Sequence, residues 1–585
     1  MTLNTRRLTA VLLAGAALAA CAGRDAADTT EPAPSGSTSP ATDTAPAASV
    51  AATAPGSSSP AADTAPDTAA TTEPSTMGSG SGELSPTTPA ATNEVESATW
   101  AVYREPNTLD PIYAFDYPEN TVITSMCEAV LQQQPDGTIG PGLATLSRPD
   151  DTTLLLSLRE GVTFWDGTPL TAEDVVFSLQ RQFDPALGGF YGAVFTNVSS
   201  IEATAADEVT ISLKAPDVWL EGELSSMPGI VISKAFADEQ GQAYGTPDGG
   251  VMCTGPFQLT SWKIGDRVSV VRNESYWNGA PKVGAMDFVG VPDEATLTAG
   301  FLTGDVDGSY IGPMATFDQL SSSPSLTVTQ GPSYASAALI VSSLEGPLGD
   351  LAVRRALSDA IDREGLVESL YHGAAQLPRA IAGPGTWGYA PEVFQAAWDE
   401  LPVPVRDVEG ARAAVEAAGV SGGKIVLATT NEIAAIATAA NAIRSAAEEI
   451  GLRVELKTVS AANYINLFVD PSARAGVDAF VTVNYPDYAD PAALLSTFAL
   501  ADGSQNYSGY QNETVTELLE QARSELDPTA RAELVAQAQA ILQEELPWIP
   551  LALPNTVLVT SAELTGAPSS FVYMNAPWPA TLGGV

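Results

Sequence analysis

The fold is decided by four successive segments: KIVLATT at 424–430, EIAAIATAANAIRSAAEEI at 432–450, LRVELKTV at 452–459 and DAFVTVNY at 478–485. The first, third and fourth are short and rich in β-branched and apolar residues, which predicts strands. The second has apolar residues at helical spacing and predicts a helix, and a further helix is expected near Asn463. Strands separated by helices need crossover connections, so the pattern predicts an α/β fold with a parallel sheet.

Other segments predict helices in the rest of the chain. Thr171 and Asp174 have the spacing of a capping box and open a helix that runs through Gln182. Helices are also expected from Pro118 to Leu131 and from Leu351 to Tyr371. A chain of 585 residues with 45% hydrophobic residues exceeds what one core usually organises, so two or more lobes are expected.

The composition argues against several classes of protein. There are 26 Lys plus Arg residues against 70 Asp plus Glu residues, a formal net charge of −44. A nucleic-acid partner is not expected, because binding to phosphates needs clustered cations. One histidine, His372, and three cysteines leave little for a zinc site, a haem or a serine triad. We therefore expect no cofactor and no metal site, and an enzyme is the less favoured hypothesis.

The N-terminus has the form of an export signal. Two arginines precede a 13-residue apolar run from Leu8 to Ala20, which is too short to span a bilayer. The run ends in Leu18-Ala19-Ala20-Cys21, which resembles the lipobox of bacterial lipoproteins, where cleavage leaves a lipidated cysteine. We expect a signal peptide at 1–20 and lipidation of Cys21. An ordinary cleavage site beside a chance cysteine is the alternative.

Residues 22–98 consist mostly of Ala, Thr, Ser and Pro. Such a segment buries too little apolar surface to offset chain entropy, so we expect residues 21–98 to form a disordered tether, with the folded part beginning near Trp100. A tether of this length could hold a domain away from a membrane surface. A glycosylated stalk is compatible with the same composition.

Cys127 and Cys253 remain as an even pair if Cys21 is lipidated. In an oxidising compartment an even pair favours a disulfide. The bond would tie an early helix to the turn that begins at Thr254. Two free buried thiols are the alternative.

The fourth strand ends in NYPDYADP at 484–491. Ligands of open parallel sheets gather at the carboxyl ends of the strands. Two tyrosines and two aspartates held between prolines could supply a stacking surface and a counter-charge for a cationic group. A turn whose acids are solvated, or cap the next helix, is the alternative.

A dense run of family-like sequence, LREGVTFWDGTPLTAEDVVFS, occupies 158–178. Shorter motifs fall around it in the same family's order: PNTLDP at 106–111, PGLA at 141–144, TGPF at 254–257, GDVD at 304–307, RRAL at 354–357, AIDR at 360–363 and DYADP at 487–491. Together they resemble the solute-binding proteins of ABC importers, family 5, which contains oligopeptide-, dipeptide- and nickel-binding lipoproteins. The resemblance runs from about Trp100 to the C-terminus.

The resemblance implies a periplasmic-binding-protein-like α/β fold (class II, cluster C) with two lobes, an extra subdomain and a hinge. The implied boundaries are 99–141, 228–340 and 553–585 for lobe I, 142–227 for the subdomain and 341–552 for lobe II. A monomer of this kind captures a peptide or peptide-like solute and delivers it to ABC permease subunits. With Cys21 lipidated, it would be anchored to the outer face of the cytoplasmic membrane.

Asp487 matches the family aspartate that pairs with the α-ammonium of a peptide in the peptide-binding members. The other ligand-binding residues that the resemblance suggests are Tyr485, Tyr488, Trp387, Asn107 and Thr254. The dipeptide-binding pattern places arginines early in the helix at 432–450, where this chain has Ala437 and Thr438. Recognition of a free carboxylate is therefore not implied, although longer peptides can be held by backbone pairing.

Alternative functions remain open at this point. The same fold could bind a sugar or a metal chelate, although His372 precedes Gly373 in the manner of a helix-terminal residue rather than a ligand. A lipoprotein that senses a solute without transporting it is a second alternative. A secreted hydrolase that uses Asp487 and Asp490 as paired carboxylates is a third.

Overall fold

The computed structural model describes residues 84–585. The expected signal peptide, Cys21 and the expected tether up to residue 83 lie outside the described residues. Within residues 84–585, no helix is both long enough and apolar enough to cross a membrane. Three large sheets organise this part of the chain, and we name the regions around them lobe I, the subdomain and lobe II.

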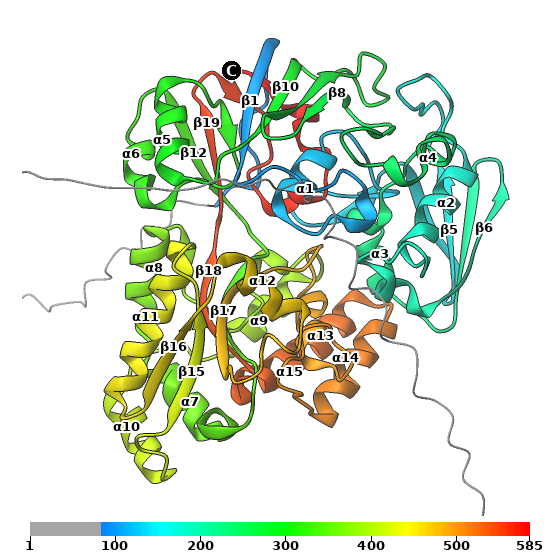
Figure 1. The fold of residues 1–585 in the computed structure, drawn as a ribbon. Helices are drawn as coiled ribbons and strands as arrows, with labels where there is room; N and C mark the ends of the chain where they lie inside the picture. The colour runs from blue at the N-terminus through cyan, green and yellow to red at the C-terminus, as the bar shows by residue number, and fades with distance from the viewer. Residues whose placement is uncertain (1–83) are drawn as a thin grey trace, which may run out of the picture. The chain divides into compact units, whose positions relative to one another are not determined.

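Lobe I is built on a seven-stranded sheet in the order β12-β19-β11-β1-β10-β9-β8 (Figure 1). Its strands are β1 (Val95–Val102), β8 (Phe257–Lys263), β9 (Arg267–Arg272), β10 (Val283–Gly290), β11 (Gly308–Ser309), β12 (Leu326–Gly331) and β19 (Thr556–Ser561). The central strand β1 is parallel to β10 and to β11. Its Trp100 is fully buried, with ring centres of Trp578 at 4.3 Å and Tyr310 at 5.3 Å, so aromatic packing forms the centre of this core.

The subdomain has a four-stranded antiparallel sheet in the order β4-β5-β7-β6. Its strands are β4 (Ala144–Asp150), β5 (Thr153–Leu158), β6 (Val198–Ala205) and β7 (Glu208–Leu213). Helix α2 (Ala172–Gln182) packs on this sheet and begins with the predicted capping box, in which Thr171 and Asp174 satisfy each other's backbone amides. A small hairpin of β2 (Leu131–Gln133) and β3 (Ile139–Pro141) leads into the subdomain.

Lobe II has a six-stranded sheet in the order β14-β18-β13-β17-β15-β16. Its strands are β13 (Ser336–Val341), β14 (Ala375–Gln376), β15 (Lys424–Thr429), β16 (Arg453–Thr458), β17 (Ala479–Asn484) and β18 (Trp548–Pro554). Strand β15 is parallel to β16 and to β17, as predicted. The other half of the sheet, for which the sequence predicted no strand direction, is antiparallel: β13 is antiparallel to β17 and to β18. The reason is that β13 enters from lobe I and β18 returns to it, so these neighbours run in opposite directions.

The remaining α-helices of the described chain are α1 (Tyr117–Ile123), α3 (Trp219–Glu223), α4 (Lys234–Gln240), α5 (Glu294–Thr303), α6 (Phe317–Ser321), α7 (Leu351–Ala360), α8 (Arg363–Tyr371), α9 (Pro391–Glu400), α10 (Val408–Ala417), α11 (Ala434–Glu449), α12 (Ala461–Val469), α13 (Pro491–Ala499), α14 (Glu513–Ser524) and α15 (Pro528–Glu545). The helix predicted from Pro118 to Leu131 is shorter, because the hydroxyls of Thr124 and Ser125 bond to carbonyls of the preceding turn, at 2.7 and 2.6 Å. The helix predicted over 351–371 is two helices, because Asp362 caps the second one through the amide of Gly365 at 2.9 Å.

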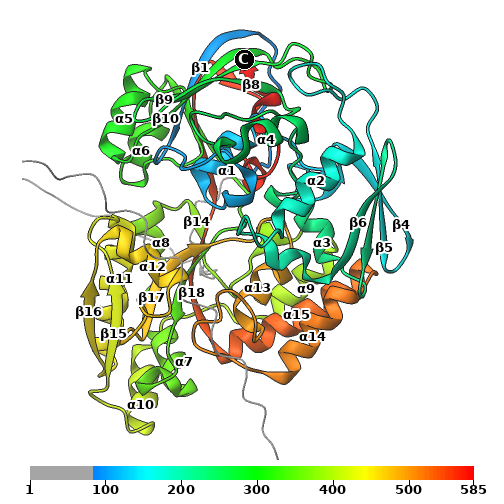
Figure 2. The same ribbon diagram turned by 45° about the vertical axis from the view of Figure 1, so that its right-hand side comes forward.

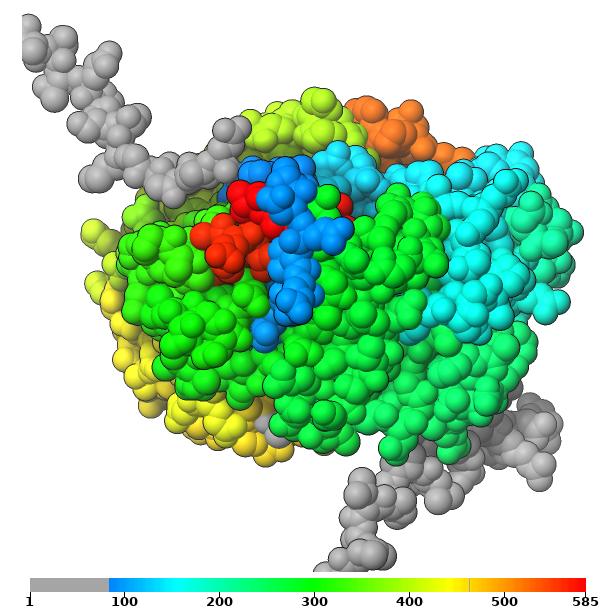
Figure 3. All heavy atoms as spheres, turned by 90° about the horizontal axis from the view of Figure 1, so that it is seen from above, coloured from blue at the N-terminus to red at the C-terminus, as the bar shows by residue number. Residues whose placement is uncertain are grey.

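The segment 84–98 is part of the folded unit, contrary to the expected tether boundary. The amides of Thr92 and Asn93 donate to the carbonyl of Gly584 at 2.9 and 3.1 Å, and the amide of Thr88 donates to that of Ala567 at 3.3 Å. The earliest described residues therefore lie beside the C-terminal residues, next to the hairpin of β20 (Leu564–Thr565) and β21 (Gly583–Gly584), as Figure 3 shows in blue and red. Backbone pairing, rather than apolar content, orders this proline-containing stretch.

Two short segments join lobe I to lobe II: one leads from β12 to β13, and the other leads from β18 to β19. Asn555 in the second segment donates to Oε1 of Gln330 at 2.8 Å, and the hydroxyl of Thr556 donates to the carbonyl of Pro332 at 3.0 Å. Figure 2 shows β18 running from lobe II towards lobe I. This pair of bonded segments forms the hinge of the two-lobed fold.

Cys127 and Cys253 form a disulfide, with Cα atoms 5.0 Å apart. The sequence predicted this pairing but placed Cys127 in a helix. The residue instead follows the end of α1, and the bond joins two loops beside lobe I.

Candidate ligand-binding site

The loop between β17 and α13 is the place where lobe I, the subdomain and lobe II meet. The hydroxyl of Tyr485 donates to the carbonyl of Phe115 at 3.2 Å, and its ring centre lies 5.0 Å from that of Tyr117 in lobe I. On the other side, a Cβ atom at Gly222 of α3 would overlap the ring of Tyr488, so this tyrosine packs directly on the subdomain. We call this meeting point the junction.

Asp487 lies at the junction with its backbone fixed and its carboxylate unengaged. The side-chain amides of Gln133 and Asn575 each donate to its carbonyl oxygen at 2.7 Å. Its carboxylate forms no hydrogen bond or ion pair with any residue of 84–585. Burial raises the pKa of the Asp487 carboxyl to about 6. Such a group is arranged to receive a proton donor or a cation.

Asp490 has a structural role at the same loop. Its Oδ1 accepts a hydrogen bond from the amide of Ala492 at 2.8 Å, which caps α13, and another from the hydroxyl of Tyr389 at 3.1 Å. Burial raises the pKa of this carboxyl to about 6. A hydrolase that used Asp487 and Asp490 as paired carboxylates would need both groups free. Asp490 is instead bonded in the helix cap.

Trp387 lies on the lobe II side of the junction. The amide of the next residue, Gly388, donates to the carbonyl of Ala489 at 3.0 Å, which ties the tryptophan loop to the Asp487 loop. The ring of Trp387 stacks on Phe394 and meets Trp398 edge-on, with centres 6.1 and 6.0 Å away. Its indole nitrogen is buried and has no partner among the described residues. Trp387 is therefore a packed aromatic side chain whose buried indole N–H has no partner among the described residues.

The hydrogen bonds of Asn107 and Thr254 go to glutamates of lobe I. The hydroxyl of Thr254 donates to the buried carboxylate of Glu128 at 2.8 Å, beside the disulfide. Asn107 is exposed, and its backbone N–H donates to Oε1 of Glu119 at 2.7 Å. Among the described residues, neither side chain forms a hydrogen bond with the Asp487 loop.

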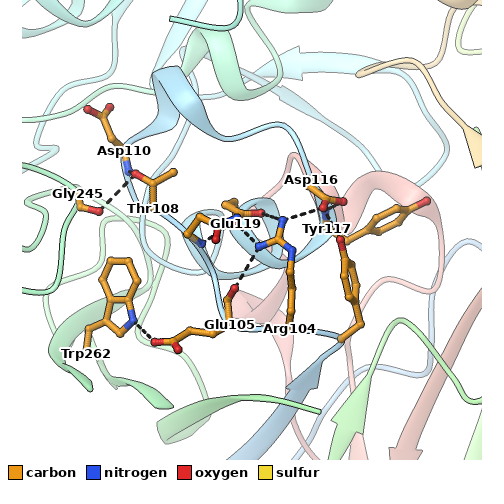
Figure 4. A network of polar contacts seen from close by, with 11 residues as sticks. Arg104, Glu105, Thr108, Asp110, Asp116, Tyr117, Glu119, Gly245 and Trp262 are labelled. Carbon is orange, nitrogen blue, oxygen red and sulfur yellow. Dashed lines mark hydrogen bonds and ion pairs between the residues drawn. The ribbon is translucent and has the colours of Figure 1, made fainter. Parts of the chain in front are cut away.

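Glu119 belongs to the polar network of lobe I drawn in Figure 4. Arg104 reaches Oε1 of Glu119 and Oδ2 of Asp116, each at 2.7 Å, and Glu119 is almost fully buried. Oδ1 of Asp116 accepts from the amide of Tyr117 at 2.8 Å and so caps α1. The network holds Tyr117 in the position where it meets Tyr485.

The start of α11 lacks cationic side chains. A small pocket there is lined by apolar and small side chains, among them Tyr371, Ala435, Ile436, Ala439, Val481, Val483 and Leu551. Arg444 lies further along α11 and bonds to Asn441 of its own helix at 2.8 Å. The surface at the start of α11 is therefore apolar, and Ala437 and Thr438 are not among the residues that line this pocket.

His372 ends α8 in the left-handed conformation, with φ 46°, as expected for a helix-terminal residue. Its Nδ1 lies 4.0 Å from Oδ2 of Asp318. Within residues 84–585, no group of three or more His, Cys, Asp or Glu side chains is arranged to hold a metal ion.

Glu223, at the end of α3, is the junction residue that sequence analysis missed. Its Oε2 is buried without a hydrogen-bond partner among the described residues. Burial, and then the charge of Asp487, raises the pKa of the Glu223 carboxyl well above its usual range. The helix WLEGE at 219–223 carries no motif, and only long-range packing places it beside the Asp487 loop.

Known proteins resemble this chain over most of its length. The family described as bacterial extracellular solute-binding proteins, family 5 middle, matches residues 138–506. The periplasmic murein peptide-binding protein MppA of Escherichia coli K12 is 27% identical over 477 residues, which cover 76% of this chain and 86% of MppA. The glutathione-binding protein GsiB of the same strain is 27% identical over 479 residues, which cover 78% of this chain and 89% of GsiB.

A solved structure agrees with the fold described above. The periplasmic binding protein DppA of Helicobacter pylori, in complex with the peptide STSA, has a TM-score of 0.72 at 21% identity, covering 84% of this chain and 98% of DppA. The family match spans more than half of the chain and includes the subdomain and the strands that lead to Asp487. The chain therefore belongs to the bacterial extracellular solute-binding proteins of family 5.

Proposed function

We propose that this protein captures a peptide or peptide-like solute with a free ammonium group at the junction and delivers it to an ABC permease. One observation carries the proposal: the Asp487 carboxylate is held in place through its backbone and has no partner within the described residues. A partly buried carboxylate without a partner is stabilised when a cation pairs with it. The names of MppA, GsiB and DppA, which describe binding of peptides or glutathione, support this class of solute.

The two ends of such a solute would be bound differently. Asp487 would pair with the ammonium group, while Tyr485, Tyr488 and Trp387 would enclose the chain next to it. The apolar start of α11 offers no counter-charge for a terminal carboxylate. The remainder of the solute is therefore held by backbone pairing and apolar contact, which favours peptides longer than a dipeptide.

The proposed location follows from the N-terminus. A signal peptide at 1–20 would direct export, and lipidation of Cys21 would anchor a monomer to the outer face of the cytoplasmic membrane, where permease subunits lie. Replacing Cys21 by serine should release the protein from the membrane fraction, and labelling with a radioactive fatty acid should be lost. Retention of the label in this variant would contradict the anchor.

Calorimetry with a peptide probe tests the binding proposal. Ala-Ala-Ala should bind the native protein, whereas N-acetyl-Ala-Ala-Ala, which lacks the ammonium group, should not. Asp487→Asn should weaken binding of Ala-Ala-Ala by roughly two orders of magnitude, because a buried ammonium loses its partner. Asp151→Asn, at an exposed turn of the subdomain, is the matched control and should leave affinity unchanged. Equal binding of the free and the acetylated peptide would refute the role of Asp487.

A further inference from the structure

Glu223 and Asp487 bring two carboxylates to the junction from different parts of the fold. The side-chain amide of Gln133 donates both to the carbonyl of Asp487 at 2.7 Å and to that of Ser225 at 3.3 Å, so the end of α3 and the Asp487 loop share one donor. Gly222 packs against the ring of Tyr488. Gly222 directly precedes Glu223 in the chain, and Tyr488 directly follows Asp487. One acid comes from the subdomain and the other from lobe II.

Neither carboxylate is neutralised by the described part of the protein. Oε2 of Glu223 is buried without a partner, and the carboxylate of Asp487 has no bonding partner there either. The positive charge of Arg523 lowers the pKa of Glu223, but its guanidinium is bonded to a different acid. Its Nε donates to Oδ2 of Asp217 at 2.9 Å, and its guanidinium lies 5.2 Å from the ring centre of Trp219. Neither acid at the junction therefore forms an ion pair with a cation of the described residues.

The proximity of the two acids makes them costly to ionise together. The pKa of Glu223 is raised by burial first and then by the negative charges of Asp487 and Asp217. The pKa of Asp487 is raised to about 6 by burial. Like charges in a desolvated site disfavour each other, and a bound cation removes that cost. A single ammonium group balances only one of the two.

The geometry points to a solute that brings two positive charges to the junction, one for Asp487 and one for Glu223. This inference rests on the proposed function, in which Asp487 takes the terminal ammonium of a peptide. The second charge then belongs to the side chain of the first residue, because that side chain starts one carbon atom from the ammonium nitrogen. The substrate class is peptides that begin with lysine, ornithine or another diamino acid.

A pair of matched peptides tests the inference by calorimetry. Lys-Ala-Ala and norleucine-Ala-Ala have first side chains of nearly equal length, and only the lysine side chain carries a charge. The native protein should bind the lysine peptide at least about tenfold more tightly. Glu223→Gln should reduce this preference to less than about twofold. Glu202→Gln, at an exposed strand of the same subdomain, should keep the full preference.

The other outcomes separate this inference from the proposed function. Equal binding of the two peptides by native protein, or an undiminished preference in Glu223→Gln, overturns the two-charge site and leaves peptide capture standing. The native comparison needs no variant, so a folding defect in Glu223→Gln does not remove the test. If neither peptide binds but 1,5-diaminopentane binds in a Glu223-dependent manner, the two-charge site stands and peptide capture fails. If none of the three probes binds, both proposals are overturned.

Discussion

Replacing Asp487 by asparagine should stabilise the ligand-free protein at neutral pH, although the same change weakens binding. Burial raises the pKa of the Asp487 carboxyl from its ordinary 3.8 to about 6, so the folded protein holds this proton more tightly than the unfolded chain does. The stabilisation from the proton is fully present below about pH 4 and is lost as the pH rises through about 6. Two pKa units correspond to roughly 3 kcal/mol of unfolding free energy. Asparagine carries no charge and avoids this loss.

Urea denaturation followed by tryptophan fluorescence measures the effect. At about pH 7.5 the unfolding free energy of Asp487→Asn should exceed that of the native protein by about 2 to 3 kcal/mol, and at about pH 4 the two should coincide. Asp151→Asn should show no such gain, because its parent side chain is exposed. If Asp487→Asn is less stable than the native protein at neutral pH, the carboxylate supports the fold and the argument for an unpaired binding group fails.

Three further predictions concern the scaffold. Gly222→Ala should separate the subdomain from the ring of Tyr488, so small-angle scattering should show a larger radius of gyration and calorimetry a weaker peptide affinity; unchanged values would contradict the packing. Replacing both Cys127 and Cys253 by serine should lower the unfolding free energy by about 4 kcal/mol, because the bond closes a long loop in the unfolded chain, and thiol titration of the denatured native protein without reductant should find neither of these two thiols free. Deleting residues 84–93 should lower the midpoint of urea unfolding, since their backbone bonds to the C-terminal residues are lost; an unchanged midpoint would show that they are dispensable.

Local patterns predicted those parts of the fold that depend on neighbouring residues. The capping box at Thr171 and the strand-helix-strand order from β15 to β16 are recorded in short windows of sequence, and the structure has them. The antiparallel half of lobe II could not be predicted in this way, because β13 and β18 pair across more than two hundred residues of intervening chain. The order of residues 84–93 was missed for the same reason, since it depends on hydrogen bonds to the other end of the chain.

The residues of the candidate site also differ in whether a local sequence pattern marks them. Asp487 was found because it follows a strand and matches a family motif. Glu223 was missed because the sequence of α3 contains no motif. The Glu223 carboxylate is a candidate site group only because the fold places it close enough to Asp487 for their charges to interact. Gln133 and Asn575 were missed because they act on the carbonyl of Asp487, a backbone group that no sequence pattern marks.

The position of β19 in lobe I has a consequence for the order in which the protein folds. This strand lies between β11 and β12, yet it is made only after the whole of lobe II. Until it arrives, β11 and β12 have open edges towards each other, and the lobe I sheet is in two pieces. Closure of that gap is a pairing of very high sequence separation, which makes it a late and slow event. Lobe I would therefore remain incompletely folded until β19 has been synthesised, and for a chain that is exported, as the N-terminus predicts, this is the state in which it can still be threaded across a membrane.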